Sequence, residues 1–505
     1  ELIALQLAAG SVADAVGILR DHRDAIAAKM PAVARGDEQT VQRCADFLRT
    51  TFARDERGDY RDAFVASVRQ AIDSRSSRRS PVRKGVILHV LNSLAAGGTE
   101  RQCVSVATHQ ARLLPDHEIW VLRIDPRGTG RAVFYLPALK QARVHTATLA
   151  EYAATAGEVA RELPFLSEAP PLLRSQVNCR EIATLLGAMR AIRPQVVHAW
   201  TPQCCMHAGI AGLLFGADRI VLRGGSVAPN QRGETTEVET AQAAWTAKAM
   251  RFVLGYPTAV LANNCHANLA SWIQWLDLDA DSARRAVVIK NVFDSSAFGS
   301  SRSPGSDAPS PVRPSGAAFV VGSVMRLERE KDPELWVEVV TEAAGRFPDW
   351  HFVLGGAGRL RLAVQRKLAA RGLLDRVTLA GAVHEGLADY YAAFDALLLT
   401  SQFEGVPNVL IEAQHFGVPA VATDVGGVRE ALDHGSTGFA VASRDPAELA
   451  NTLRAICEDK AQGGSAAEAC RRFAQRFEPA AVIDDLLRIY ADTGAAARKA
   501  NLHGI

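Results

Sequence analysis

Short apolar runs alternate with helix-forming stretches in two separate parts of this chain, and this alternation constrains its fold more than any other feature. Apolar runs of strand length that are separated by helices are typical of a parallel sheet covered on both faces. The runs are 86–91, 196–200, 219–223 and 259–263 in the first part, and 319–323, 350–354, 377–380, 396–399 and 420–423 in the second. The sequence therefore predicts an α/β fold with two doubly wound, Rossmann-like domains. Ligands of such sheets bind at the carboxyl ends of the strands, so two facing domains predict a site in the cleft between them.

The length of 505 residues fits this division, because so long a chain exceeds what one hydrophobic core supports. The N-terminal stretch has apolar residues at helical spacing only and predicts a small all-α module. A second break in composition, rich in Ser, Pro and Gly, predicts a linker between the domains. The predicted boundaries are 1–72 for the helical module, 73–84 for a basic linker, 85–298 for the first Rossmann-like domain, 299–316 for the second linker, 317–475 for the second Rossmann-like domain and 476–505 for a C-terminal segment.

Charge and composition limit the partners and the compartment. The 57 basic and 55 acidic side chains nearly balance, so nothing predicts a nucleic-acid partner. No apolar run reaches the roughly 18 residues of a membrane span. The start at Glu1 shows no signal-peptide pattern, and the eight cysteines have no zinc-like spacing, so we expect a cytoplasmic protein with reduced thiols. The basic, Ser-rich linker 73–84 is read as a solvated tether; the alternative is a contact with anionic lipid headgroups at the inner face of a membrane.

The segment 401–413 carries two carboxylates around a predicted helix start. Glu404 lies in a Gly/Pro turn, and Glu412 lies in the helix that follows. Pro407 suits the first helical turn, where a missing N–H costs nothing. Free amides at a helix N-terminus attract an anion, and carboxylates accept hydrogen bonds from hydroxyls, so a nucleotide-sugar would fit this volume. The amides expected to face the preceding loop are those of Asn408, Val409 and Leu410. The alternative is an ordinary acidic helix start.

This segment resembles the E-x(7)-E motif of retaining glycosyltransferases of the GT-B fold, glycosyltransferase family 4 (group 1), in the form E-G-x-P-x-x-x-x-E-A. The resemblance runs from about Gly85 to Tyr490 and does not cover the helical module. It implies that Glu404 contacts hydroxyls of the transferred sugar, that Glu412 holds the ribose, and that Gly405 belongs to the donor site.

A second stretch, 322–333, is similar to the family's strand-end G-R-L-x-x-x-K segment and adds Gly322 to the expected donor site. The resemblance gives Arg326 and Lys331 the role of a basic pair on the donor diphosphate. Two fixed cations would neutralise the leaving group in place of a metal, so we expect no metal and no cofactor. The alternative is an exposed loop with ordinary charges.

Two glycine turns extend the resemblance. Residues 354–358 lack the third glycine of a nicotinamide fingerprint and resemble the family's glycine turn, which implies a backbone role for Gly356 near the nucleotide. Gly97 and Gly98 resemble the family's G-G-x-E loop, where a residue without a side chain lets the backbone approach the diphosphate and the acceptor. A simple strand-to-helix turn is the alternative for this pair.

Three further residues at or after strand ends are candidates for acceptor or phosphate contacts. His198 ends an apolar run in which Trp200 replaces the second histidine of many relatives, and it joins the predicted catalytic set. His207 and Arg223 are candidates for the acceptor. A single histidine is more often structural, so that alternative stays open. The segment from Arg476 to Tyr490 resembles the family's closing helix, which crosses back to the first domain.

The sequence therefore predicts a metal-independent, retaining transfer of a sugar from a nucleoside-diphosphate donor, UDP by family habit, to a hydroxyl acceptor. The acceptor would be a saccharide or a lipid-linked saccharide in polysaccharide or glycolipid biosynthesis. The alternatives are a nucleotide-sugar epimerase of the same architecture, a non-catalytic scaffold and simple donor hydrolysis. No protein base is required, since the departing phosphate oxygen can accept the proton of the hydroxyl.

Overall fold

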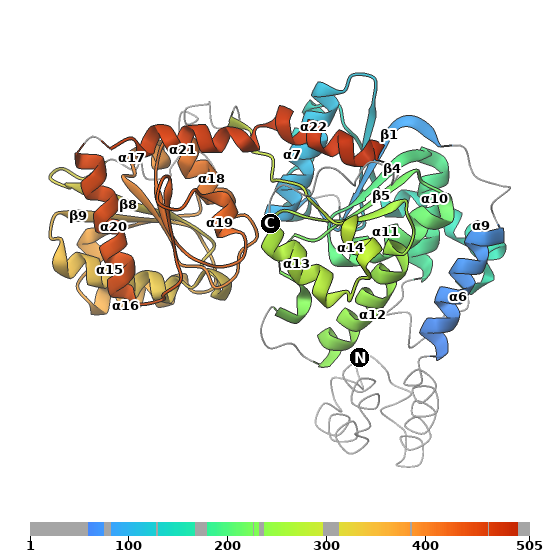
Figure 1. Cartoon of the computed structure of the whole chain (residues 1–505), viewed down its shortest axis with the longest axis horizontal. Coiled ribbons are helices and arrows are strands. Elements are labelled where there is room, and N and C mark those ends of the chain that lie inside the picture. Colours follow the sequence, from blue (N-terminus) through green and yellow to red (C-terminus); the bar gives the residue numbers. More distant parts are fainter. Residues whose placement is uncertain are drawn as a thin grey trace, which may run out of the picture.

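The computed structural model describes residues 59–74, 82–127, 130–166, 179–225, 227–231, 237–295, 313–383, 386–462 and 464–492. These residues form two α/β domains that lie side by side (Figure 1). Most of the predicted helical module and most of both predicted linkers lie outside the described residues. Within the described ranges, no helix joins sufficient length to sufficient apolar character for a bilayer crossing.

The first domain contains a seven-stranded parallel sheet in the order β3-β2-β1-β4-β5-β6-β7. Its strands are β1 (Arg83–Leu91), β2 (Glu118–Arg123), β3 (His145–Thr148), β4 (Pro194–Ala199), β5 (Arg219–Arg223), β6 (Ala259–Asn263) and β7 (Val287–Val288). The helices between them are α7 (Gly98–Leu113), α8 (Leu136–Gln141), α9 (Thr155–Glu162), α10 (Cys179–Ile192), α11 (Pro202–Phe215), α12 (Glu237–Leu254), α13 (His266–Trp275) and α14 (Ala280–Arg284). Two buried apolar clusters cover the sheet, as expected when helices flank both faces.

The second domain contains a six-stranded parallel sheet in the order β10-β9-β8-β11-β12-β13. Its strands are β8 (Phe319–Val324), β9 (Trp350–Gly355), β10 (Val377–Gly381), β11 (Ala396–Leu399), β12 (Ala420–Thr423) and β13 (Gly438–Val441). Its helices are α15 (Pro333–Arg346), α16 (Arg361–Ala370), α17 (Leu387–Ala393), α18 (Asn408–His415), α19 (Val428–Ala431) and α20 (Pro446–Ala461). The two sheets confirm the predicted fold class of two Rossmann-like domains.

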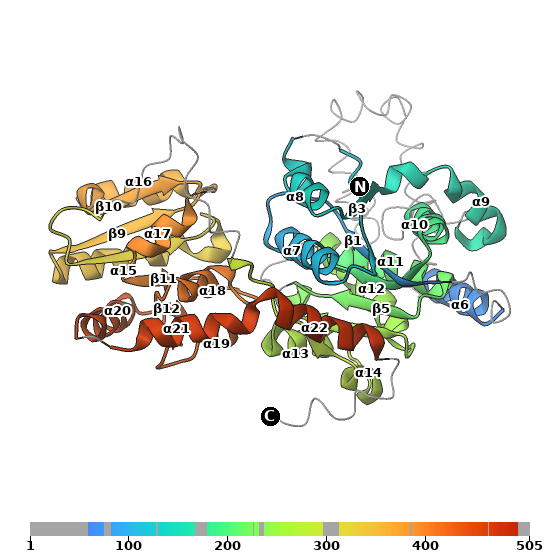
Figure 2. The same cartoon turned by 90° about the horizontal axis from the view of Figure 1, so that it is seen from above.

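A pair of helices at the end of the described chain connects the two domains. Helix α21 (Ala466–Ala474) packs on α18 of the second domain, and α22 (Pro479–Ala491) packs on α7 of the first. Both views show this run lying along the two domains (Figures 1 and 2). The amide of Phe293 also donates to the carbonyl of Phe477 at 2.7 Å, which ties the crossing point to the chain that leaves the first domain. The chain therefore returns to the first domain, as the resemblance implies.

Helix α6 (Asp59–Ser74), at the end of the predicted helical module, packs into the first domain. Phe64 and Val68 are buried there, and the Phe64 ring meets the Trp245 ring of α12 edge-on, with centroids 6.1 Å apart. This part of the predicted module therefore shares the core of the first domain.

Candidate active site

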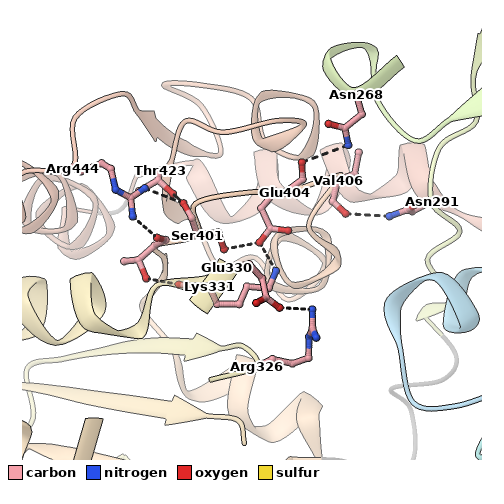
Figure 3. Close-up of polar contacts among 11 residues, drawn as sticks. Asn268, Asn291, Arg326, Glu330, Lys331, Ser401, Glu404, Val406, Thr423 and Arg444 are labelled. Carbon is pink, nitrogen blue, oxygen red and sulfur yellow. Dashed lines mark hydrogen bonds and ion pairs between the residues drawn. The ribbon is translucent and has the colours of Figure 1, made fainter. Parts of the chain in front are cut away.

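A buried ion pair between Lys331 and Glu404 forms the centre of the candidate site. The Lys331 ammonium donates to Oε1 of Glu404 at 2.5 Å, and the Ser401 hydroxyl donates to the same oxygen at 2.6 Å (Figure 3). Lys331 follows β8, whereas Ser401 and Glu404 follow β11, and these strands are neighbours in the sheet. Loops at the carboxyl ends of adjacent parallel strands thus place a cation and a carboxylate together, where an open α/β sheet binds its ligands.

The backbone around Ser401 is held by side chains from the end of β12 and from the loop after β13. The carbonyl of Ser401 accepts hydrogen bonds from the Thr423 hydroxyl at 2.6 Å and from Arg444 at 3.1 Å. Arg444 also binds the Asp332 carboxylate at 2.6 Å, beside Lys331. Figure 3 shows Ser401, Thr423 and Arg444 around the loop that carries Glu404. Such support fixes the orientation of Glu404, as a site that must hold a ligand in one pose requires.

Arg326 lies at the same edge of the sheet but is much more open to solvent. Its side chain is 69% exposed and is paired with Glu330 at 2.7 Å, as Figure 3 shows. The backbone carbonyl of Glu330 accepts a hydrogen bond from the Gln402 amide at 2.8 Å, so this loop contacts the loop that precedes Glu404. Arg326 and Lys331 therefore lie on one loop. The Arg326 guanidinium is exposed and can change its position, whereas the Lys331 ammonium is already bound to Glu404.

Gly356 shapes the backbone that carries Arg326. Its φ of 151° is in a region that favours glycine, and a Cβ there would lie 1.8 Å from the carbonyl oxygen of Met325. The amide of Met325 donates to the carbonyl of Gly355 at 2.9 Å, so the two strand ends stay in contact. Gly356 therefore acts through its close approach to the neighbouring backbone, which positions the Arg326 loop.

Helix α18 starts close to where the sequence predicts it. Pro407 is the N-cap residue rather than a residue of the first turn, and Asn408 is the first helical residue. The amide of Leu410 donates to the Pro407 carbonyl at 3.1 Å, so it is not free for an anion, contrary to the prediction. The N-terminal amides that remain for a phosphate are those of Asn408 and Val409.

Glu412, one turn into α18, is almost completely buried, with a relative solvent exposure of 1%. Its Oε2 accepts a hydrogen bond from the Tyr391 hydroxyl at 2.6 Å, and its Oε1 is paired with Arg101 of the first domain. Burial, reinforced by the carboxylate, raises the pKa of Tyr391 well above its usual value, so the phenol stays protonated and donates. The carboxylate predicted to hold the ribose is thus bound by one residue from each domain.

The start of α18 contacts α7 of the first domain directly. Oδ1 of Asn408 accepts hydrogen bonds from Gln102 at 3.3 Å and from Asn291 at 2.9 Å. Asn291 also donates to the carbonyl of Val406 at 3.1 Å. The two domains therefore meet through polar side chains at the helix start where the sequence predicts the donor phosphates.

Glycines line the contact between the two domains. A Cβ on Gly405 would lie 2.7 Å from the Asn264 side chain and 3.1 Å from the carbonyl oxygen of Gly225. Gly97 caps α7, and a Cβ on Gly98, its first residue, would meet no atom within 4 Å. Backbone surfaces thus face each other here, and the open space beside Gly98 leaves room for a ligand to approach the start of α7.

Comparison with known proteins matches the second domain to one family. The model of the family described as "Glycosyl transferases group 1" matches residues 318–459, which hold β8 to β13 together with Arg326, Lys331, Glu404 and Glu412. Residues 318–459 thus match the group 1 glycosyl transferase family, and the two-domain arrangement is the GT-B fold.

Curated relatives and solved structures agree with this assignment. The Vi polysaccharide biosynthesis protein VipC/TviE of Salmonella typhi is 26% identical over 72% of this chain and 64% of its own length. Alpha-D-kanosaminyltransferase of Streptomyces kanamyceticus is 31% identical over 35% of this chain and 46% of its own length. The matched region thus spans less than two thirds of either relative. Alr3699/HepE of Anabaena, solved in complex with UDP, shares the fold with a TM-score of 0.59 and 19% identity, covering 80% of this chain and 98% of that one.

Gly322 lies in the glycosyl transferase domain but not at the ligand edge of its sheet. It is inside β8, and a Cβ there would lie 2.1 Å from the Phe394 ring. This glycine makes room for an aromatic side chain in the core. The prediction that Gly322 contacts the donor is therefore wrong in this structure, because Phe394 occupies the space in front of it.

His198 is fully buried in the first domain. Its Nδ1 lies 2.8 Å from the Tyr490 hydroxyl of α22, and its ring stacks on Trp200 with centroids 4.5 Å apart. Burial, helped by His89 nearby, lowers the pKa of His198 well below its usual value, so the ring is neutral. His198 therefore packs against the returning helix, which contradicts its predicted contact with substrate.

His207 and Arg223 are also buried and bound by protein groups. Nδ1 of His207 lies 2.5 Å from Oε1 of Glu181, between α11 and α10. Arg223 lies over the Trp200 ring at 4.6 Å and donates to Asn291 at 3.2 Å. Neither side chain is available to an acceptor in this conformation. Arg223 instead supports Asn291, which in turn binds Asn408.

Several residues that build the site escape the motif-based reading. Arg101 and Gln102 lie in the first turns of α7, three and four residues after Gly98, and this position beside the predicted glycine turn is the signal that could have marked them. Tyr391 and Asn291 carry no such signal, since their partners lie elsewhere in the sequence. Arg101, Gln102 and Asn291 each contact helix α18 or the residues just before it in the second domain.

Proposed function

We propose that this protein transfers a sugar from a nucleoside-diphosphate donor, with UDP as the nucleotide, to a hydroxyl of a saccharide acceptor, with retention at the anomeric carbon. The observation that carries the proposal is the Lys331–Glu404 pair with Arg326 beside it, at the carboxyl ends of β8 and β11 in a group 1 glycosyl transferase domain. The complexes of Alr3699/HepE with UDP and with UDP-glucose support the choice of nucleotide.

Each group has a part in this reaction. Glu404 accepts hydrogen bonds from hydroxyls of the transferred sugar, while Lys331 holds its carboxylate in place. The diphosphate binds at the amides of Asn408 and Val409, and Arg326 swings from Glu330 to the phosphates as they gain charge. Glu412 receives the ribose. Because Arg326 and Lys331 supply two positive charges, the proposed reaction uses no metal ion.

The covalent step balances without a protein base. The acceptor hydroxyl approaches on the face from which the diphosphate leaves, and its oxygen forms the new bond to the anomeric carbon. The bond between that carbon and the phosphate oxygen breaks, and the departing oxygen takes the hydroxyl proton. The protein contributes positioning and charge stabilisation, which are large terms in such reactions.

The acceptor is a saccharide, free or lipid-linked, in polysaccharide or glycolipid biosynthesis. The similarity to the Vi polysaccharide biosynthesis protein supports the polysaccharide class. A lipid-linked acceptor would bring a cytoplasmic protein to the inner face of the membrane, where the basic sequence of the linker 73–84 favours contact with anionic lipids.

A donor screen tests the proposal. Thermal unfolding is measured with UDP, GDP and ADP and with their sugars, and the best donor is incubated with saccharide acceptors for mass spectrometry. A product heavier than the acceptor by one sugar residue, with the donor's anomeric configuration by NMR, is expected. An isomerised donor formed without any acceptor would instead indicate an epimerase, and release of free sugar alone would indicate hydrolysis. Failure of every nucleotide to bind would contradict the proposal.

A further inference from the structure

The Arg101–Glu412 pair is an ion pair across the two domains, and it covers the carboxylate that the proposed function assigns to the ribose. Arg101 belongs to the first turn of α7, whereas Glu412 belongs to α18. The carboxylate raises the pKa of Arg101, so the guanidinium stays charged. With Tyr391 on its other oxygen, Glu412 is almost inaccessible. A ribose diol cannot reach the carboxylate until one of these partners moves.

Tyr391 is the less movable partner. Its side chain is completely buried, and its ring stacks on Phe416 with centroids 5.6 Å apart and meets Phe394 edge-on at 5.9 Å. Moving it would open the core of the second domain. Packed aromatic groups of this kind resist displacement, because the lost contacts leave a cavity.

Arg101 is free to move by comparison. Its side chain is 36% exposed, and it comes from the opposite domain. A long arginine side chain can change rotamer without disturbing the core. When a ribose takes its place on Glu412, the guanidinium is released beside Gly97 and Gly98, where the space in front of Gly98 is open.

We propose that Arg101 is a further donor-binding residue, which exchanges the Glu412 carboxylate for the diphosphate of the donor when the ribose arrives. This inference rests on the proposed function. The exchange conserves the charge pairing: the ribose hydroxyls satisfy Glu412, and a phosphate satisfies Arg101. Arginine matches phosphate with paired, charge-assisted hydrogen bonds, so the exchange leaves no charge uncompensated.

The exchange makes a specific demand on the ligand. A nucleoside has a ribose but no phosphate, so its binding breaks the Arg101–Glu412 ion pair and leaves the Arg101 guanidinium without a charged partner. A nucleoside diphosphate breaks the same pair and supplies a new partner. Arg101 therefore favours diphosphates over nucleosides, in addition to any contribution from Arg326 and Lys331.

The test compares UDP with uridine on the full chain by isothermal titration calorimetry. In Arg101→Met, which keeps the side-chain length and removes the charge, uridine binds at least as tightly as in the unaltered protein and UDP binds more weakly. The ratio of the two affinities is expected to fall by roughly tenfold or more, the loss of one charge-assisted contact. Arg112→Met, on the same helix, is the matched control and should leave the ratio unchanged, since Arg112 lies near Asp294 and not Glu412.

Arg101→Lys guards against a variant that fails to fold, because it keeps the charge and should retain most of the ratio. An unchanged ratio in a folded Arg101→Met protein, or equal weakening of both ligands, would overturn the inference while the proposed function stands. Absence of binding by UDP, GDP and ADP to the unaltered protein would overturn the proposed function itself, so the two failures are distinguishable.

Discussion

Each domain places polar side chains near the carboxyl ends of its parallel strands, yet the two sets end in different surroundings. In the second domain, Lys331 and Glu404 lie on loops after β8 and β11 and are supported by other loops at the same edge. In the first domain, His198 and Arg223 lie on β4 and β5 and are buried. The rule that open α/β sheets bind ligands at the carboxyl ends of their strands cannot tell which of the two sets binds a ligand, because it does not consider which other elements pack over those ends.

Helix α22 covers the strand-end residues of the first domain, and this explains why they are buried. The Trp200 indole donates to Nδ1 of His89 at 3.0 Å, so the proton of His89 is on Nε2, which lies 2.7 Å from Oε1 of Gln110. Gln110 donates to the Tyr490 hydroxyl at 3.3 Å, and that hydroxyl is 2.8 Å from His198. These hydrogen bonds join neutral groups under the returning helix. The first set of strand-end residues therefore holds the two domains together, while the second set faces the proposed ligand.

The largest expected effect comes from removing the cation of the second set. Lys331→Met leaves the buried Glu404 carboxylate without its charged partner and removes one positive charge from the proposed leaving group. We expect kcat/KM for sugar transfer to fall on the order of a hundred- to a thousandfold. Lys367→Met, on α16 of the same domain, is the control and should behave like the unaltered protein. Full activity in Lys331→Met would contradict the proposal that the second-domain residues bind the ligand while the first-domain residues do not.

Low pH should destabilise the protein through the buried histidine His89, which belongs to the hydrogen-bonded network of the first domain. Burial lowers the pKa of His89 to about 4, from 6.5 in an unfolded chain. Between these values the unfolded state binds more protons, so the free energy of unfolding is highest above pH 6.5 and falls as the pH decreases towards 4. One such histidine can account for about 3 kcal/mol. Urea unfolding at several pH values should show a shallower decline in His89→Gln, and parallel curves for the two proteins would contradict this assignment.

Arg326→Ala should have a moderate effect on the donor. The exposed guanidinium is proposed to leave Glu330 for the diphosphate, so its loss should raise KM for the nucleotide-sugar roughly tenfold, as expected for one charge-assisted contact. The neighbouring exposed Arg329, changed to alanine, provides the matched control. Steady-state kinetics with varied donor measures the effect. Equal values for both variants would exclude Arg326 from the site.

The smallest expected effect is on stability alone. Tyr490→Phe removes the hydroxyl that contacts Gln110 and His198, which should cost about 1–2 kcal/mol in the free energy of unfolding. Sugar transfer by the folded variant should be unchanged, because the hydroxyl lies away from the Lys331–Glu404 pair. Tyr152→Phe serves as a control for the substitution itself. A large fall in kcat for Tyr490→Phe, with normal stability, would show that the first set takes part in the reaction.

The fold was predictable at most of the central strands, although the interior strand β2 was not predicted, and less so at the edges of the sheets. The central runs such as 86–91 and 396–399 correspond to β1 and β11. β3 and β7, with four and two residues, lie at the ends of the first sheet and lack a continuous apolar run. Short edge strands are partly solvated, so their sequences carry a weaker hydrophobic signal.

The site was predictable within one domain but not between domains. The family resemblance implied that Glu404 and Lys331 share the donor site, and their side chains are in direct contact. The pairing of Glu412 with Arg101 joins residues 311 positions apart, and the contact of His198 with Tyr490 spans 292 positions. Such contacts depend on how α7 and α22 dock, which no local pattern in the sequence records.

The central claim is that Glu404 binds the sugar that is transferred, and one measurement tests it most directly. Single-turnover transfer from the best donor is compared between the unaltered protein, Glu404→Gln and the surface control Glu468→Gln, with folding checked by thermal unfolding. Glutamine keeps the size of the side chain but loses the charge that Lys331 and the sugar hydroxyls share. The account predicts a rate lower on the order of a hundredfold for Glu404→Gln alone, with both variants folded. A folded Glu404→Gln protein that transfers sugar at the unaltered rate would contradict it.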